Sequence, residues 1–156
     1  MDILARINED LVTSIKSRTE ELRVSTLRMM KSAIKNAEIA KRGKGALLEE
    51  DILSVLSTMV KQRKESAEQY QKGNRVDLVE KETGEIAIIQ EYLPEQLTVL
   101  EIDGMIHEAI RKTGVTGVKE MGRLMKELMP MVKGKADGKI VNQLVKEILE
   151  NLENKA

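Results

Sequence analysis

Apolar residues recur every three or four positions along almost the whole chain, which is the period of an amphipathic α-helix. In the first part of the chain, the apolar stripes predict four helices, which lie within residues 3–15, 22–37, 52–71 and 76–92. Gly43, Gly45 and Gly73 mark the ends of the second and third helices, because glycine favours helix termination. Gly84 falls inside the fourth helix and weakens the prediction that this helix is continuous.

Three further helices are predicted after Pro94, which ends the fourth helix because a residue before proline disfavours the helical conformation. Thr98 and Glu101 have the spacing of a capping box and start the fifth helix, which stops at Gly114. Pro130 is expected to close the sixth helix, whose apolar stripe begins at Val118 and continues to Leu128.

Asp137 is the predicted N-cap of a seventh helix, with an apolar stripe between residues 140 and 149. No segment alternates in the manner of a β-strand, so the pattern predicts an all-α fold. The segment from 93 to 97 is expected to be a linker. We therefore predict an N-terminal four-helix domain at residues 1–97 and a small three-helix C-terminal domain at residues 98–156.

The composition of the 156 residues excludes several chemistries. The chain has no Cys, and its single histidine, His107, cannot build a multi-histidine metal site. No nucleophile has a visible base, so we expect no catalytic residues, metal or cofactor. With two Tyr and no Phe or Trp, the chain also lacks the aromatic platforms on which single-stranded nucleic acid stacks.

The longest apolar runs are about four residues, far below the roughly 20 residues of a membrane span, so no membrane partner is expected. Acidic and basic residues alternate through the first turns, unlike a secretory leader. On these grounds the predicted location is cytoplasmic.

The 26 basic and 26 acidic residues cancel in sum but are segregated along the chain. Residues 16–44 hold nine basic and three acidic residues, and residues 77–108 hold nine acidic residues against Lys81 alone among Lys and Arg. Residues 119–139 hold six basic and three acidic residues. Charged helical faces are most often simply solvated, so the first two blocks by themselves indicate no partner.

The third block contains a lysine-rich loop, Lys133-Gly-Lys-Ala-Asp-Gly-Lys139, that leads into a predicted helix start. Helix N-terminal amides surrounded by lysines suit phosphate oxygens, and glycines allow a nucleic-acid backbone to approach closely. Asp137 opposes this interpretation, because its carboxylate would satisfy the same amides. The loop is therefore either a phosphate-backbone site or a plain capped turn. It does not match a P-loop, since Ala136 follows Gly134-Lys135 and no strand precedes them.

Two other patterns have simpler explanations. His107 lies near Asp103 and Glu108, but a surface histidine explains this spacing better than a metal site. Met121, Met125 and Met129 fall on one helical face and are expected to be core residues, although methionine also suits adaptable partner surfaces.

Several stretches resemble one protein family over nearly the whole chain. These are 27–36, 61–66, the junction EIAIIQEYLPEQL at 85–97, MGRLMK at 121–126 and MPMVKGKADGK at 129–139. They resemble the YqeY (GatB/YqeY) family, and the last stretch is also similar to the tail of the B subunit of tRNA-dependent amidotransferases. Met131 departs from the pattern, standing where that tail often carries a basic residue.

The resemblance implies an all-helical protein whose tail holds structured RNA while other subunits carry the chemistry. It implies RNA contacts by eight residues: Lys119, Arg123, Lys126, Lys133, Gly134, Lys135, Gly138 and Lys139. The leading hypothesis is thus a translation-related, non-catalytic accessory protein that binds tRNA or another structured RNA. Two alternatives stay open: a component of a carbon–nitrogen ligase with glutamine as amido-N-donor, which works with separate amidotransferase subunits on mischarged tRNA, and a protein–protein adaptor.

Overall fold

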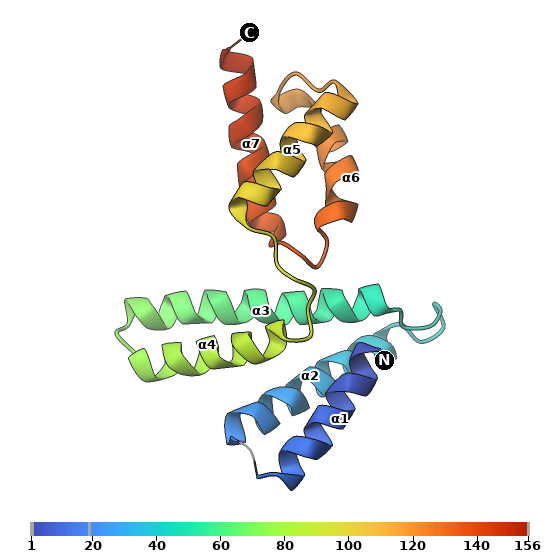
Figure 1. Cartoon of the computed structure of the whole chain (residues 1–156), viewed down its shortest axis with the longest axis vertical. Coiled ribbons are helices and arrows are strands. Elements are labelled where there is room, and N and C mark those ends of the chain that lie inside the picture. The colour runs from blue at the N-terminus through green and yellow to red at the C-terminus, as the bar shows by residue number, and fades with distance from the viewer. Residues whose placement is uncertain (1, 19, 156) are drawn as a thin grey trace. The chain divides into compact units, whose positions relative to one another are not determined.

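The computed structural model describes residues 2–18 and 20–155, which form seven α-helices, one short 3-10 helix and no strand (Figure 1). The predicted all-α class is confirmed. The chain divides into two compact units, Met1–Pro94 (unit 1) and Glu95–Ala156 (unit 2). Each unit encloses a hydrophobic core of its own.

Unit 1 consists of two helical hairpins (Figure 1). Its helices are α1 (Ile3–Lys16), α2 (Glu21–Ala40), α3 (Glu49–Lys72) and α4 (Val76–Gln90). α1 packs against α2, and the longer α3 packs against α4. All four helices contribute to the core, through side chains that include Ile7, Leu27, Leu56 and Ile89.

α4 continues through Gly84 without a break. A methyl group at this position would lie 2.8 Å from Leu22 Cδ2 of α2. The glycine therefore allows α2 and α4 to approach closely, and it does not interrupt the helix.

Unit 2 contains α5 (Val99–Thr113), the 3-10 helix η1 (Val118–Glu120), α6 (Met121–Val132) and α7 (Gly138–Asn154). The three predicted capping features are confirmed. The Thr98 hydroxyl accepts from Glu101 N, while the Glu101 carboxylate accepts from Thr98 N. Gly114 ends α5 in the left-handed conformation, with φ 70°, and the Asp137 side chain caps α7.

The prediction that Pro130 closes the sixth helix is wrong, because α6 contains Pro130 and extends to Val132. Proline removes one backbone donor, but burial of neighbouring side chains outweighs this loss. Leu128 and Val132 are both fully buried in the core of unit 2, one on each side of Pro130, and Pro130 itself is exposed. Tertiary packing therefore sets the end of α6.

Met121, Met125 and Met129 of α6 are partly buried and pack against the core of unit 2, as expected for core positions. Within the described residues, no helix combines the length and the apolar character that crossing a bilayer requires.

Candidate nucleic-acid interface

The eight residues that the sequence nominated for RNA contact all belong to unit 2. Lys119 lies in η1, Arg123 and Lys126 lie in α6, and Gly138 and Lys139 begin α7. The other three, Lys133, Gly134 and Lys135, lie in the loop between α6 and α7. All six cationic residues are exposed, whereas the two glycines are half-buried.

Four of these cations lie in or beside α6. Arg123 and Lys126 are three residues apart within α6 and share a helical face. Lys119 precedes α6 in η1 and Lys133 follows its last residue, so these two cations flank the helix. We call these four cations, together with Lys135 and Lys139, the α6 basic face.

Arg123 is the member of the α6 basic face that has protein partners. Its Nη2 donates to the carbonyl oxygen of Thr113 at 3.0 Å and lies 3.2 Å from Glu120 Oε1. The Thr116 amide, which donates to Glu120 Oε2 at 2.7 Å, is the largest influence holding the Glu120 pKa below its usual value, and Arg123 contributes to the same effect. Arg123 therefore joins the end of α5 to η1, and part of its charge is compensated.

The five lysines of the α6 basic face differ from Arg123. Across residues 2–18 and 20–155, no carboxylate forms an ion pair with Lys119, Lys126, Lys133, Lys135 or Lys139. Unpaired ammonium groups keep their full charge for an anionic ligand and need not break a salt bridge to bind it.

The loop between α6 and α7 is held in one conformation by hydrogen bonds from two directions. Within the loop, Lys135 N donates to Val132 O at 2.9 Å, and Gly134 adopts φ 78°, a left-handed conformation that favours glycine. From the segment before α5, Gln96 Nε2 donates to Gly134 O at 3.0 Å and Leu97 N donates to Lys135 O at 2.8 Å. Sequence reasoning treated Gln96 and Leu97 as linker residues and missed this role.

The start of α7 bears on the choice between a phosphate site and a capped turn. Asp137 Oδ1 accepts from Lys139 N at 2.9 Å, so that amide is satisfied by the protein. A phosphate bound here would therefore be held by lysine side chains and not by this amide. Another acidic group that sequence reasoning missed is Glu153, which accepts from Val118 N at 2.8 Å and fills the space beside Gly117.

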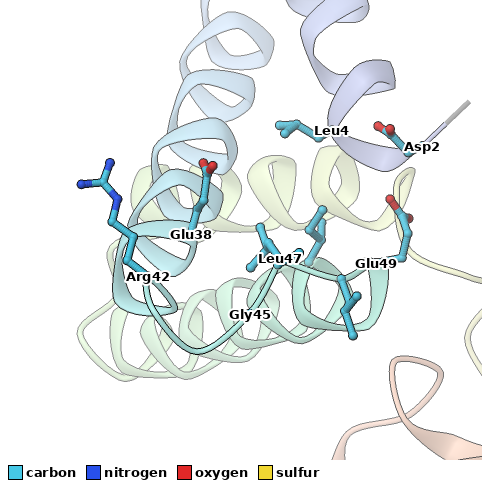
Figure 2. Close-up of a pocket in the computed structure, with 10 residues that line it drawn as sticks. Asp2, Leu4, Glu38, Arg42, Gly45, Leu47 and Glu49 are labelled. Carbon is cyan, nitrogen blue, oxygen red and sulfur yellow. The ribbon is translucent and has the colours of Figure 1, made fainter.

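Two other features of the described residues are His107 and a pocket in unit 1. His107 is exposed on α5, and no group of three or more potential ligands among these residues could hold a metal ion. A pocket of about 640 Å³ in unit 1 lies between the start of α1 and the loop before α3 (Figure 2). Two carboxylates that line the pocket already accept hydrogen bonds from backbone amides of α1. Asp2 accepts from Ala5 N at 2.7 Å, and Glu49 accepts from Ile3 N at 3.3 Å.

The fold defines an all-α protein built from two helical units. The family description "Yqey-like protein" matches residues 4–149, and the chain therefore belongs to this family. The resemblance noted in the sequence is thus confirmed.

Three similar proteins come from fungi. "Altered inheritance of mitochondria protein 41, mitochondrial" of Lachancea thermotolerans is 41% identical over 93 residues, which cover 60% of this chain and 49% of that protein. The chain thus spans about half the length of this relative. An uncharacterized protein of Schizosaccharomyces pombe is 37% identical over 60% of this chain and 74% of its own length. The Pyrenophora tritici-repentis protein named like the first is 28% identical over 94% of this chain and 81% of its own length.

The names of the Lachancea and Pyrenophora proteins describe them as mitochondrial, and this finding contradicts the cytoplasmic location predicted from the sequence. That prediction rested on the mixed charges of the first turns. These residues form α1, whose apolar side packs into the core of unit 1, so their charge pattern is that of a folded amphipathic helix. Such a pattern carries no information about location.

Proposed function

We propose that this chain is a non-catalytic accessory protein that binds the sugar–phosphate backbone of structured RNA, with tRNA as the preferred class. The observation that carries the proposal is the clustering of five lysines in the α6 basic face, which lack carboxylate partners among the described residues. Lysines contact phosphates without reading sequence, and the near-absence of aromatic residues argues against recognition of splayed bases. The likeness of residues 129–139 to the amidotransferase tail supports the same assignment.

The loop between α6 and α7 supports binding by shape. Its backbone is fixed by Gln96 and Leu97, so Lys133 and Lys135 project from a preorganised segment. In this proposal units 1 and 2 act as separate domains of four and three helices, and the second supplies the RNA contacts. Limited proteolysis near Pro94 that releases a folded C-terminal fragment would support this division.

The experiment is a fluorescence anisotropy titration of labelled tRNA with the wild-type chain and with Lys133→Glu/Lys135→Glu. The matched control is Lys61→Glu/Lys64→Glu, which changes the net charge equally at exposed positions of α3. We expect the unit 2 variant to lose on the order of tenfold in affinity and the control to lose about twofold or less. Equal losses in both variants would show a non-specific charge effect and refute the assignment.

Because two relatives are named as mitochondrial, a mitochondrial tRNA belongs among the probes. The second candidate function is a component of a carbon–nitrogen ligase that acts on mischarged tRNA, and it is favoured by the same tail resemblance. Its test is glutamine- and ATP-dependent amidation of aminoacyl-tRNA by separate catalytic subunits, with and without this chain. An unchanged rate and an unchanged KM for the tRNA would reject the second candidate.

A further inference from the structure

The outward side of α2 in unit 1 carries three cations without acidic partners. Arg28, Lys31 and Lys35 are exposed and lie three and four residues apart, which places them on one helical face. No described carboxylate pairs with them. Two other cations of unit 1 do form ion pairs. Arg23 Nη1 lies 3.0 Å from Glu91 Oε2, and Lys41 Nζ lies 2.6 Å from Asp51 Oδ2.

The three cations line a shallow groove of about 510 Å³ together with Ser32 and Asn36 of α2 and Leu11 of α1. Ser32 and Asn36 are on the surface of α2, and their side chains make no hydrogen bond to other described residues. The groove therefore presents positive charge beside free hydroxyl and amide donors. After Asn36, the next acidic residue along α2 is Glu38. Glu38 does not line the groove; it lines the pocket of Figure 2.

This combination matches a phosphodiester backbone. Arg, Lys, Ser and Asn side chains are the usual donors to phosphate and sugar oxygens. From Arg28 to Lys35 the row covers about 10 Å of helix axis, and a nucleic-acid strand presents a phosphate every few ångströms of its length. The groove contains no aromatic side chain, so it cannot stack bases and is suited to backbone contact.

An acidic amphipathic helix and a membrane fit the groove less well. Both need a row of apolar anchors, whereas the only apolar residue lining the groove is Leu11, which is 8% exposed. Val12 and Ile15 of α1 are about half exposed, but they do not line the groove.

We propose that the groove formed by Leu11 and the outward side of α2 is a second RNA-backbone site, which contacts the same RNA as the α6 basic face. The nature of the ligand rests on the proposed function, whereas the site itself rests on unit 1 alone. Two weak sites on one chain bind a single RNA more tightly than either site would alone, because the second contact is intramolecular.

The test measures tRNA affinity of the full chain by anisotropy for Lys31→Glu/Lys35→Glu, beside the unit 2 variant and the α3 control. Unchanged helical circular dichroism and thermal midpoints establish that the variants fold. We expect a loss on the order of tenfold for the α2 variant, against about twofold or less for the control. A neutral variant, Lys31→Gln/Lys35→Gln, should give a smaller loss in the same direction.

The outcomes separate the two proposals. If the α2 variant behaves like the control while the unit 2 variant loses affinity, the groove is not an RNA site and the inference is overturned. If only the α2 variant loses affinity, the groove stands as an RNA site, whereas the proposed function of unit 2 and the sharing of one RNA by both sites fail. If the α2 variant keeps its RNA affinity but loses binding to phosphatidylserine vesicles or to an acidic helical peptide, the groove serves that other partner and the inference is wrong.

Discussion

Arg63 of α3 and Glu85 of α4 form an ion pair that is largely shielded from solvent. Arg63 Nε lies 2.8 Å from Glu85 Oε2, and the two side chains are 13% and 5% exposed. Arg63 also donates to Met59 O at 3.2 Å, within its own helix. The pair therefore connects the two helices of the longer hairpin at a position where an unpaired charge would be costly.

Removing the acidic partner should be strongly destabilising. We expect Glu85→Ala to lower the free energy of unfolding by about 3–5 kcal/mol, because the Arg63 guanidinium would stay buried without its counter-charge. The measurement is urea denaturation followed by circular dichroism. The matched control is Asp77→Ala, which removes the exposed pair between Arg75 and Asp77, with atoms 3.3 Å apart, and should cost much less stability because solvent screens both charges. Similar losses of unfolding free energy in both variants would contradict the view that burial makes the Arg63–Glu85 pair costly to break.

Tyr92 should make the stability depend on alkaline pH. Burial, and next the hydrogen bond that its hydroxyl donates to Asp10, raise the Tyr92 pKa well above its usual value. In the unfolded chain tyrosine loses its proton near pH 10, while the folded state retains it. Above about pH 10 the unfolded state thus binds fewer protons, and the free energy of unfolding falls as pH rises, by at most about 1.4 kcal/mol per pH unit from this group.

The measurement is urea denaturation at pH 8 and at pH 10.5 for the wild type and Tyr92→Phe. The variant should be less stable at pH 8, by about 1–3 kcal/mol, because the Asp10 carboxylate loses a hydrogen bond. Its stability should then fall less between the two pH values than that of the wild type. Parallel losses in the two proteins would show that Tyr92 does not carry this dependence.

Two glycines inside helices should differ in their response to alanine. At Gly104 of α5, an added methyl group would have no neighbouring atom within 4 Å, so Gly104→Ala should stabilise the chain by about 0.5–1 kcal/mol through helix propensity. At Gly84 the same methyl would lie 2.8 Å from Leu22 Cδ2, so the Leu22 side chain must shift and the stabilisation should be smaller than at Gly104. Equal stabilisation by both substitutions in thermal unfolding would contradict the close contact of α2 with α4.

Alanine substitutions at two glycines near the α6–α7 loop should distinguish an effect on folding from an effect on RNA binding. Gly134 has φ 78°, so Gly134→Ala should cost about 1–2 kcal/mol of stability. A methyl group at Gly138 would meet only Met129 Cε, at 3.9 Å, so Gly138→Ala should fold normally. If RNA approaches this surface closely, Gly138→Ala should still weaken tRNA binding in the anisotropy titration. Unchanged affinity would remove Gly138 from the interface.

The local features of the fold were predictable, because they depend on residues adjacent in sequence. The capping box of Thr98 and Glu101, the stop at Gly114 and the cap at Asp137 each follow from a side chain and its own backbone. The end of α6 was not predictable in this way. It depends on burial of Val132 in a core assembled from other elements of unit 2, which the sequence around Pro130 does not display.

The same distinction applies to the candidate sites. The clustering of basic residues between 119 and 139 is visible in the sequence. The three-residue spacing of Glu120 and Arg123 is visible too, and it signals a local role for Arg123. The bonds from Gln96 and Leu97 to the loop join residues 38 apart and have no sequence signal. The groove on α2 likewise depends on Leu11 of another helix, so the basic block at 16–44 alone does not reveal it.

The central claim is that the lysines bind RNA phosphates, and the salt dependence of tRNA affinity tests it most directly. Each neutralised phosphate releases counterions, so the logarithm of the affinity should fall linearly with the logarithm of salt concentration, with a slope of about −0.9 per contact for a duplex. The five unpaired lysines of the α6 basic face and the three cations of α2 predict about five to eight contacts for the wild-type chain, a steep slope of roughly −4 to −7. An affinity that does not change between about 50 and 200 mM salt would contradict the account.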